Sequence, residues 1–146
     1  MDKITLQPAS LADAEEIMVI EKSASGKTYS ALKNAKAILD CLKNNVVFLI
    51  KKGQTVIGSV NYEIIKKNHA RIESLALYPK FRGYGYAYLA LKSLLKKMNK
   101  YKRVDLTVHP HNIPAIKTYL ALGFIIESWK DNCYGDGEPR LIMVKR

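Results

Sequence analysis

The stretch Arg82-Gly83-Tyr84-Gly85-Tyr86-Ala87 lies between a β-rich run that ends in Leu77-Tyr78-Pro79 and a helical pattern of Leu and Lys. It therefore marks a change from strand to helix. Two glycines remove side chains from this turn, and the first backbone N–H groups of a helix have no partner within the helix. These groups and the helix dipole together favour a bound anion. The stretch predicts a phosphate-binding turn, with an ordinary glycine-rich connection as the alternative.

The composition is that of one globular domain. The chain has 146 residues, of which 48% are hydrophobic and 25% are charged, which is enough for a sizeable core. We therefore expect a single domain over residues 1–146. The apolar runs are too short for a membrane span, and the first residues do not resemble a signal peptide. Cys41 and Cys133 form no disulfide framework, which favours a reducing cytoplasm. The Cys and His spacings predict no metal site.

The formal net charge of +11 predicts attraction to anions such as a polyphosphate cofactor, nucleic acid or the ribosome. Basic residues are concentrated in residues 74–104, a range without Asp or Glu. Lys80 and Arg82 flank the glycine turn and are the candidates for contact with phosphate, whereas the lysines of the following helix are expected to face solvent. No base-stacking platform or major-groove motif accompanies the charge, so nucleic acid is not the expected partner.

The first half of the chain predicts helices followed by antiparallel strands. Ser10 and Asp13 have the spacing of a capping box, and apolar residues then recur at helical spacing. The β-rich runs that follow are separated by turn residues, and His69 is expected to be an exposed residue of one such turn. The expected elements are a strand from Lys3 to Gln7, helices from Ser10 to about Lys22 and from Ser30 to about Lys43, and strands over Val46 to Lys51, Thr55 to Ile65 and Ala70 to Leu77.

The second half predicts a helical crossover between two parallel strands. After the glycine turn, apolar residues from Ala87 to Met98 form one helical stripe. The next strand, Val104 to Val108, should lie parallel to the strand that precedes the turn. Asn112 can cap a further helix that ends at Gly123. A final hairpin is expected from Phe124 to Trp129 and from Arg140 to Val144.

Two signatures on these elements resemble those of the GNAT superfamily of acetyl-CoA-dependent N-acetyltransferases. Residues 82–87 match its turn of Arg/Gln-x-x-Gly-x-Gly/Ala. Asn112, followed by Tyr119-Leu120-Ala121-Leu122-Gly123-Phe124, matches its second signature of Asn and then Tyr-x-x-x-Gly-Phe. Each signature lies on the expected element, and the match covers nearly the whole chain. The resemblance implies an α/β fold with a mixed, mostly antiparallel central sheet, helices on both faces and a splayed pair of parallel central strands.

The resemblance also implies acetyl-CoA as co-substrate. In the family, the glycine turn binds the pyrophosphate of coenzyme A, and the pantetheine arm enters the gap between the splayed strands. These strands map to Ala70–Leu77 and Val104–Val108, and a backbone N–H near Leu75 to Leu77 would polarise the thioester carbonyl. The implied cofactor-binding residues are Leu75, Leu77, Arg82, Gly83, Tyr84, Gly85, Tyr86, Ala87 and Asn112.

Acetylation of an amine needs a neutral nucleophile, charge stabilisation on the carbonyl and a proton for the leaving thiolate. Tyr119 resembles the family tyrosine that supplies this proton; packing between helix and sheet is its alternative role. Glu73 lies in an otherwise largely apolar strand and is the first candidate for the base, although a solvent-facing position is also consistent with the sequence. His109, at the end of the other central strand, is the second candidate, and it too can belong to a plain loop.

The acceptor is the least defined part of the prediction. The segment around Tyr134 resembles the final hairpin of protein N-terminal acetyltransferases, including the ribosomal-protein type, in which Tyr134 would line the peptide entrance with His109 nearby. Those enzymes often carry Glu where this chain has Thr107. We expect acetyl transfer to a primary amine, such as a protein N-terminus or a lysine. A small amine such as a polyamine, a regulatory acetyl-CoA-binding module without turnover, a basic RNA- or ribosome-associated protein, and a homodimer stay open.

Overall fold

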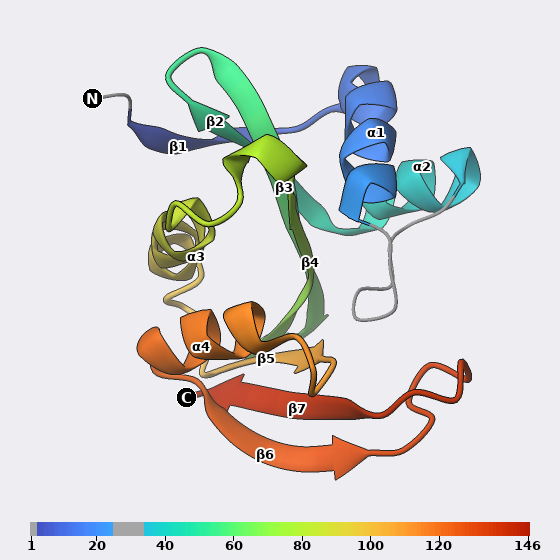
Figure 1. Cartoon of the computed structure of the whole chain (residues 1–146), viewed down its shortest axis with the longest axis vertical. Coiled ribbons are helices and arrows are strands. Elements are labelled where there is room, and N and C mark those ends of the chain that lie inside the picture. Colours follow the sequence, from blue (N-terminus) through green and yellow to red (C-terminus); the bar gives the residue numbers. More distant parts are fainter. Residues whose placement is uncertain (1–2, 25–33) are drawn as a thin grey trace.

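The computed structural model describes residues 3–24 and 34–146 and, in these residues, places one seven-stranded sheet between two pairs of helices (Figure 1). The strand order is β1-β2-β3-β4-β5-β7-β6. The strands are β1 (Ile4–Pro8), β2 (Val46–Lys52), β3 (Thr55–Lys66), β4 (His69–Leu77), β5 (Arg103–Val108), β6 (Ile125–Lys130) and β7 (Arg140–Lys145). The helices are α1 (Ala14–Ala24), α2 (Ala35–Asn44), α3 (Tyr86–Lys97) and α4 (Ile113–Ala121).

The helices cover the two faces of the sheet in pairs. Helices α1 and α2 lie on one face, and α3 and α4 lie on the other (Figure 1). The larger core forms under α3, which buries Ala90, Leu91 and Leu94 and keeps its lysines outside, as its apolar stripe predicts. A smaller core under α1 and α2 contains Ile17 and Ile38. No helix in the described residues is long and apolar enough to cross a membrane.

The predicted elements agree with the structure in type and order, and the mixed α/β sheet is confirmed. The capping box of Ser10 and Asp13 is formed, although it opens a short 3-10 turn that continues into α1. The predicted start of the second helix, residues 30–33, lies outside the described residues; within them α2 begins at Ala35, after an Asn34 cap.

The prediction for His69 is wrong. His69 is the first residue of β4, its side chain is only 18% exposed, and its Nε2 lies 2.8 Å from Oδ2 of Asp105. The sequence shows a turn of polar residues at this point but does not show that a buried acid from β5 lies opposite. His69 is therefore part of a charge cluster within the sheet.

That cluster joins β4 to β5. The Asp105 side chain is 1% exposed and also accepts hydrogen bonds from Nε of Arg71 (2.9 Å) and Nε of Arg103 (3.1 Å). Although burial opposes ionisation, the hydrogen bonds from Arg71 and His69 hold the pKa of Asp105 below its usual value. A buried carboxylate thus binds cations from both parallel strands.

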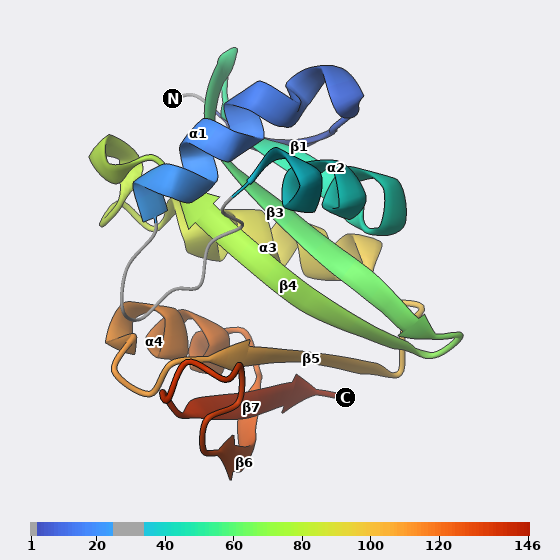
Figure 2. The same cartoon turned by 90° about the vertical axis from the view of Figure 1, so that its right-hand side faces the viewer.

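The two parallel strands are paired over only part of their length. Residues His69 to Ile72 of β4 lie in register with Arg103 to Leu106 of β5, and no pairing follows. At the same point the pairing of β4 with β3 shifts, so that Glu73 has no partner between Ile72 and Ser74. Such bulges bend a strand and increase its twist. Figure 2 shows β4 and β5 meeting at one end and diverging toward the other.

Candidate active site

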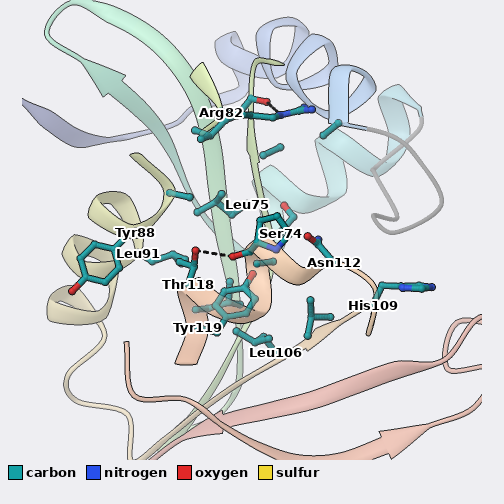
Figure 3. A pocket seen from close by; sticks show the side chains of 18 of the residues that line it. Ser74, Leu75, Arg82, Tyr88, Leu91, Leu106, His109, Asn112, Thr118 and Tyr119 are labelled. Atoms are coloured by element: carbon teal, nitrogen blue, oxygen red, sulfur yellow. Dashed lines mark hydrogen bonds between the residues drawn. The ribbon is translucent and has the colours of Figure 1, made fainter. Parts of the chain in front are cut away.

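The gap between β4 and β5 opens into a cavity of about 520 Å³. Its walls are the second half of β4, the glycine turn with the start of α3, the end of β5, and the start and inner face of α4. Ala24 at the end of α1, Tyr134, and Arg140 at the start of β7 complete them. The cavity therefore collects residues from almost every predicted part of the site. Figure 3 shows many of them around one space.

The glycine turn presents backbone groups rather than side chains. Gly83 and Gly85 have φ values of +85° and +82°, and a Cβ on either would meet nothing within 4 Å. The positive φ, not crowding, therefore requires glycine here. The backbone N–H groups of residues 83–87 make no hydrogen bond within the described residues. Open N–H groups at the start of α3 fit an anion such as a pyrophosphate.

Arg82 contributes to this turn in a different way from the one its charge suggests. Its Nε donates to the carbonyl oxygen of Leu77 (3.0 Å) and its Nη2 donates to that of Ser23 (3.1 Å). Figure 3 shows the side chain extended toward the end of α1. The guanidinium therefore joins the end of β4, the turn and α1, and it fixes the place where the turn begins.

Backbone groups of Leu75 and Leu77 face the gap. The N–H of Tyr78 donates to the carbonyl of Ile57 on β3, and in an antiparallel pair these bonds involve alternate residues. Ser74 and Ala76 therefore point their backbone groups at β3, whereas Leu75 and Leu77 point theirs away, toward β5. Since β5 has diverged at this level, the N–H of Leu75 opens into the cavity.

Tyr119 and Asn112 enter the cavity from α4. Tyr119 packs on Phe124 with 5.8 Å between ring centroids, which fixes the ring. Burial, with the nearby Tyr134, raises the pKa of Tyr119 to about 12, so the phenol keeps its proton.

Asn112 stands at the N-cap position, but its side chain makes no capping hydrogen bond, contrary to the predicted cap. Its amide lies in the cavity wall instead. Gly123 ends α4 with φ of +96°, as predicted.

Glu73 lies at the bulge and borders the cavity, although its side chain as a whole is exposed. Its pKa is raised to about 7. The largest cause is partial burial of the carboxyl group, followed by the hydrogen bond and charge of Glu63 on β3; Arg71 acts in the opposite sense. A carboxyl group with this pKa can accept a proton near neutral pH.

His109 lines the cavity but uses both ring nitrogens in protein contacts. The ring is 2% exposed; its Nδ1 accepts from the N–H of His111 (3.0 Å), and its Nε2 lies 2.8 Å from Oε1 of Glu138. Because Nδ1 is an acceptor, Nε2 carries the proton toward the carboxylate. His109 thus fixes the segment between β6 and β7, and Figure 3 shows it pointing away from Tyr119.

Tyr134 closes the other side of the cavity. Its hydroxyl is hydrogen-bonded to Oγ1 of Thr107 on β5, and the guanidinium of Arg140 lies over its ring at 4.6 Å. Arg140 is 2% exposed and pairs with Asp136 (3.0 Å). Thr107 stands at the position where a Glu was considered, and its hydroxyl group holds Tyr134 in place.

Two residues of the site were not predicted. Arg140 was expected only as the start of a strand, and Ser74 was not singled out. Ser74 carries a usable signal, because a serine between Glu73 and Leu75 in an apolar strand is a polar residue at a core position. Arg140 carries none, since its burial depends on the path of the loop before β7.

Comparisons with known proteins agree with this geometry. Residues 14–124 match the model of the acetyltransferase (GNAT) family. Ard1 from Thermoplasma volcanium has a similar structure, with a TM-score of 0.82 and 22% identity over 97% of this chain and 96% of that one. The ribosomal-protein-S18-alanine N-acetyltransferase from Escherichia coli gives 0.82 and 20%, over 97% and 92%. A GNAT family acetyltransferase from Elizabethkingia anophelis with acetyl-CoA bound gives 0.76 and 18%, over 100% and 99%.

No curated protein sequence matches the chain. The structural similarities, all below 25% identity, show the fold, and the family model covers well over half of the residues. Residues of both signatures, at residues 82–87 and from Asn112 to Phe124, lie on the predicted elements and line one cavity. The chain belongs to the GNAT family of acetyltransferases.

Proposed function

We propose that this protein transfers the acetyl group of acetyl-CoA to a primary amine at the end of a protein or peptide chain. The observation that carries the proposal is the convergence in one cavity of the phenol of Tyr119, the carboxyl group of Glu73 and the N–H groups of residues 83–87, which have no partner among residues 3–24 and 34–146. A related structure with acetyl-CoA bound supports the choice of donor. The N–H groups and Tyr119 act on acetyl-CoA, and Glu73 acts on the acceptor amine.

The donor side holds acetyl-CoA through the backbone. The N–H groups of residues 83–87 and the positive end of α3 bind the pyrophosphate. The edge of β4 from Glu73 to Leu77, without β5 beside it, pairs with the extended arm of the cofactor as a strand would. The N–H of Leu75 then donates to the thioester carbonyl oxygen and stabilises the charge that develops on it.

The chemistry uses one proton acceptor and one proton donor. Glu73 removes the proton from the incoming ammonium, so that the neutral nitrogen attacks the carbonyl carbon. As the C–N bond forms, the C–S bond breaks. Tyr119 donates its phenolic hydrogen to the departing sulfur, and its pKa of about 12 keeps that hydrogen in place beforehand. The nitrogen, now bonded to the acetyl group, releases its remaining extra proton, which converts the phenolate of Tyr119 back to the phenol. His109 has no free nitrogen for this work, so we assign it to the wall.

A chain terminus is favoured as acceptor by the shape of the acceptor side. Tyr134 is held by Thr107 and Arg140, and a rigid aromatic side chain at the entrance suits an extended peptide better than a small polycation. The similarity in fold to an enzyme described as acting on the alanine of ribosomal protein S18 points the same way. A polyamine acceptor is the second candidate, because carboxyl groups of Glu63 and Glu73 lie close together.

The test is an acetyl-CoA-dependent assay, followed by mass spectrometry, on peptides with a free N-terminus, the same peptides with a blocked N-terminus and one internal lysine, and spermidine. We expect acetylation of the first set only. Equal activity on blocked peptides would overturn the terminal amine as substrate. Tight acetyl-CoA binding without turnover on any acceptor would favour a regulatory module instead.

A further inference from the structure

The buried hydroxyl of Ser74, directly after the bulge, makes two hydrogen bonds on the side of the sheet opposite to α3. It accepts from Nδ2 of Asn61 on β3 (2.7 Å) and donates to Oε1 of Glu21 in the last turns of α1 (3.1 Å). A serine hydroxyl has one hydrogen to donate, so this arrangement has a fixed direction. Ser74 thereby connects the strand that carries Glu73 to α1.

The connection continues beyond Asn61. Its Oδ1 accepts from Nδ2 of Asn45, the residue that ends α2 (2.9 Å). Glu21, Asn61 and Ser74 are 1%, 4% and 9% exposed. A chain of donors therefore runs from Asn45 through Asn61 and Ser74 to Glu21, and it ties α2, β3, β4 and α1 together at one level. Buried polar groups are costly without partners, so each member keeps the next in place.

This series of polar residues contacts β4 just after the strand loses its pairing with β5. Up to Ile72, β4 is paired with β5 and held by Asp105. From Glu73 onward that neighbour is gone. If the bulge slipped by one residue, the hydroxyl of Ser74 would leave Glu21 and a different side chain would face the cavity. The hydrogen bonds of Ser74 therefore fix the register at which β4 leaves β5.

We propose that Ser74 is a positioning residue, and that its hydrogen bonds to Glu21 and Asn61 hold the bulge that places the carboxyl group of Glu73 in the cavity. This inference rests on the role of Glu73 in the proposed function. Without the anchor, Glu73 turns toward solvent and the amine loses its base. The oxyanion donor on Leu75 shifts to a smaller extent, because Arg82 still holds the end of β4 at Leu77.

The first test needs no acceptor. We would follow the titration of Glu73 by NMR of its carboxyl carbon in the parent and in Ser74→Ala. Ser59→Ala is the control, because Ser59 is a buried serine of β3 that does not belong to the hydrogen-bonded series from Asn45 to Glu21. In the parent, the pKa of Glu73 is about 7. The titratable and charged groups that interact with Glu73 are Cys41, Glu63, Arg71, Asp105 and Tyr134. We expect the pKa of Glu73 to fall toward 4.5 in Ser74→Ala and to keep its parent value in Ser59→Ala. A titration unchanged by Ser74→Ala would overturn the inference.

The second test is kinetic and uses acetyl-CoA with a peptide that has a free N-terminal alanine. Ser74→Ala should lower kcat about tenfold, with the KM for acetyl-CoA within about twofold, since only the base is displaced. The deficit should shrink at a pH above the pKa of the peptide amine, where no base is needed. In a Glu73→Gln background, Ser74→Ala should have little further effect.

The outcomes separate the two proposals. Full additivity of Ser74→Ala and Glu73→Gln would show that Ser74 acts elsewhere and would overturn the positioning role. An unchanged rate in Glu73→Gln alone would remove the base from the proposed function, and the NMR titration would then decide the placement of Glu73. If Ser74→Ala does not fold, Asn61→Ala removes the donor to the same hydroxyl and should give the same changes in smaller size.

Discussion

The two halves of the β4–β5 pair have opposite tasks, although they belong to the same strands. In the first half, His69 to Ile72 lie in register with Arg103 to Leu106, and buried Asp105 binds cations from both strands. In the second half the strands separate, and their edges line the cavity. Strand pairing thus stabilises the first half, whereas the second half leaves backbone groups open for a ligand.

This difference shows how a sheet can supply a binding site without losing its order. The closed half and the hydrogen bonds of Ser74 hold β4 on both sides of the bulge, and Arg82 holds its end at Leu77, so the open edge from Glu73 to Leu77 stays in the shape of a strand. Variants in the closed half should therefore reduce stability, and variants in the open half should reduce activity or binding while the fold remains stable. The four predictions below test this division.

The largest expected effect is the loss of the charge in the closed half. Asp105→Asn leaves the guanidinium groups of Arg71 and Arg103 without their buried carboxylate, and we expect a loss of about 3 kcal/mol in the free energy of unfolding. Because the folded pKa of Asp105 is lowered, its contribution is present above the ordinary value of about 3.8 and disappears as the pH falls through the lowered value. In thermal unfolding, the loss of stability caused by Asp105→Asn should therefore be smaller at pH 3 than at pH 7.

Glu127→Gln is the matched control for that cluster. Glu127 also binds Arg103, at 2.7 Å, but it lies at the surface. Its replacement should change the melting temperature much less. Equal losses of stability in both variants would mean that the burial of Asp105 does not increase its contribution. This result would contradict the stabilising role of the closed half.

In the cavity beside the open half, Tyr119→Phe on α4 should lower kcat about 100-fold, because the departing sulfur loses its proton donor. The affinity for acetyl-CoA, measured by calorimetry, should stay within about twofold, and the melting temperature should be unchanged. A variant with the parent kcat would remove Tyr119 from the mechanism.

The pH dependence isolates Glu73. In the parent, kcat/KM should rise with pH through about 7, because Glu73 must lose its proton before it can accept one from the amine. Glu73→Gln should be roughly 10- to 100-fold slower at pH 8 and should lack this rise. An identical pH profile in the variant would assign the titration to another group.

The smallest expected effect concerns the glycine turn. Gly85→Ala places a Cβ at φ of +82°, which costs about 1–2 kcal/mol. Relief of this strain moves the N–H groups, so acetyl-CoA should bind about tenfold more weakly. Gly135→Ala, at φ of +78° in the loop before β7, introduces the same strain elsewhere and should leave acetyl-CoA binding unchanged. Equal binding losses would show that the effect is general destabilisation.

The glycine turn and the helix after it could be predicted from the sequence because they depend on short, local patterns. Glycines at Gly83 and Gly85 and a strand-to-helix change identify a turn with open N–H groups, and the crossover predicts parallel neighbours. These features need only a few adjacent residues and general rules of chain geometry. The type and order of the elements follow for the same reason.

The acceptor side depends on contacts between distant residues, which local patterns do not contain. Thr107 meets Tyr134, His109 meets Glu138, and Ser74 meets Glu21 across 53 positions. His69 was predicted to be exposed for this reason, since its partner lies on another strand. The charge of Arg82 suggested a phosphate ligand, whereas its hydrogen bonds to two carbonyl groups appear only in the fold.

The place of β7 between β5 and β6 has a consequence for how the chain folds during synthesis. β5 is complete at Val108, but its second neighbour is formed by residues 140–145, so one edge of this central strand stays uncovered until those residues have emerged. An uncovered central edge can pair with other chains. Partial chains should therefore aggregate readily, and the cavity should acquire its acceptor wall only after the last strand has inserted.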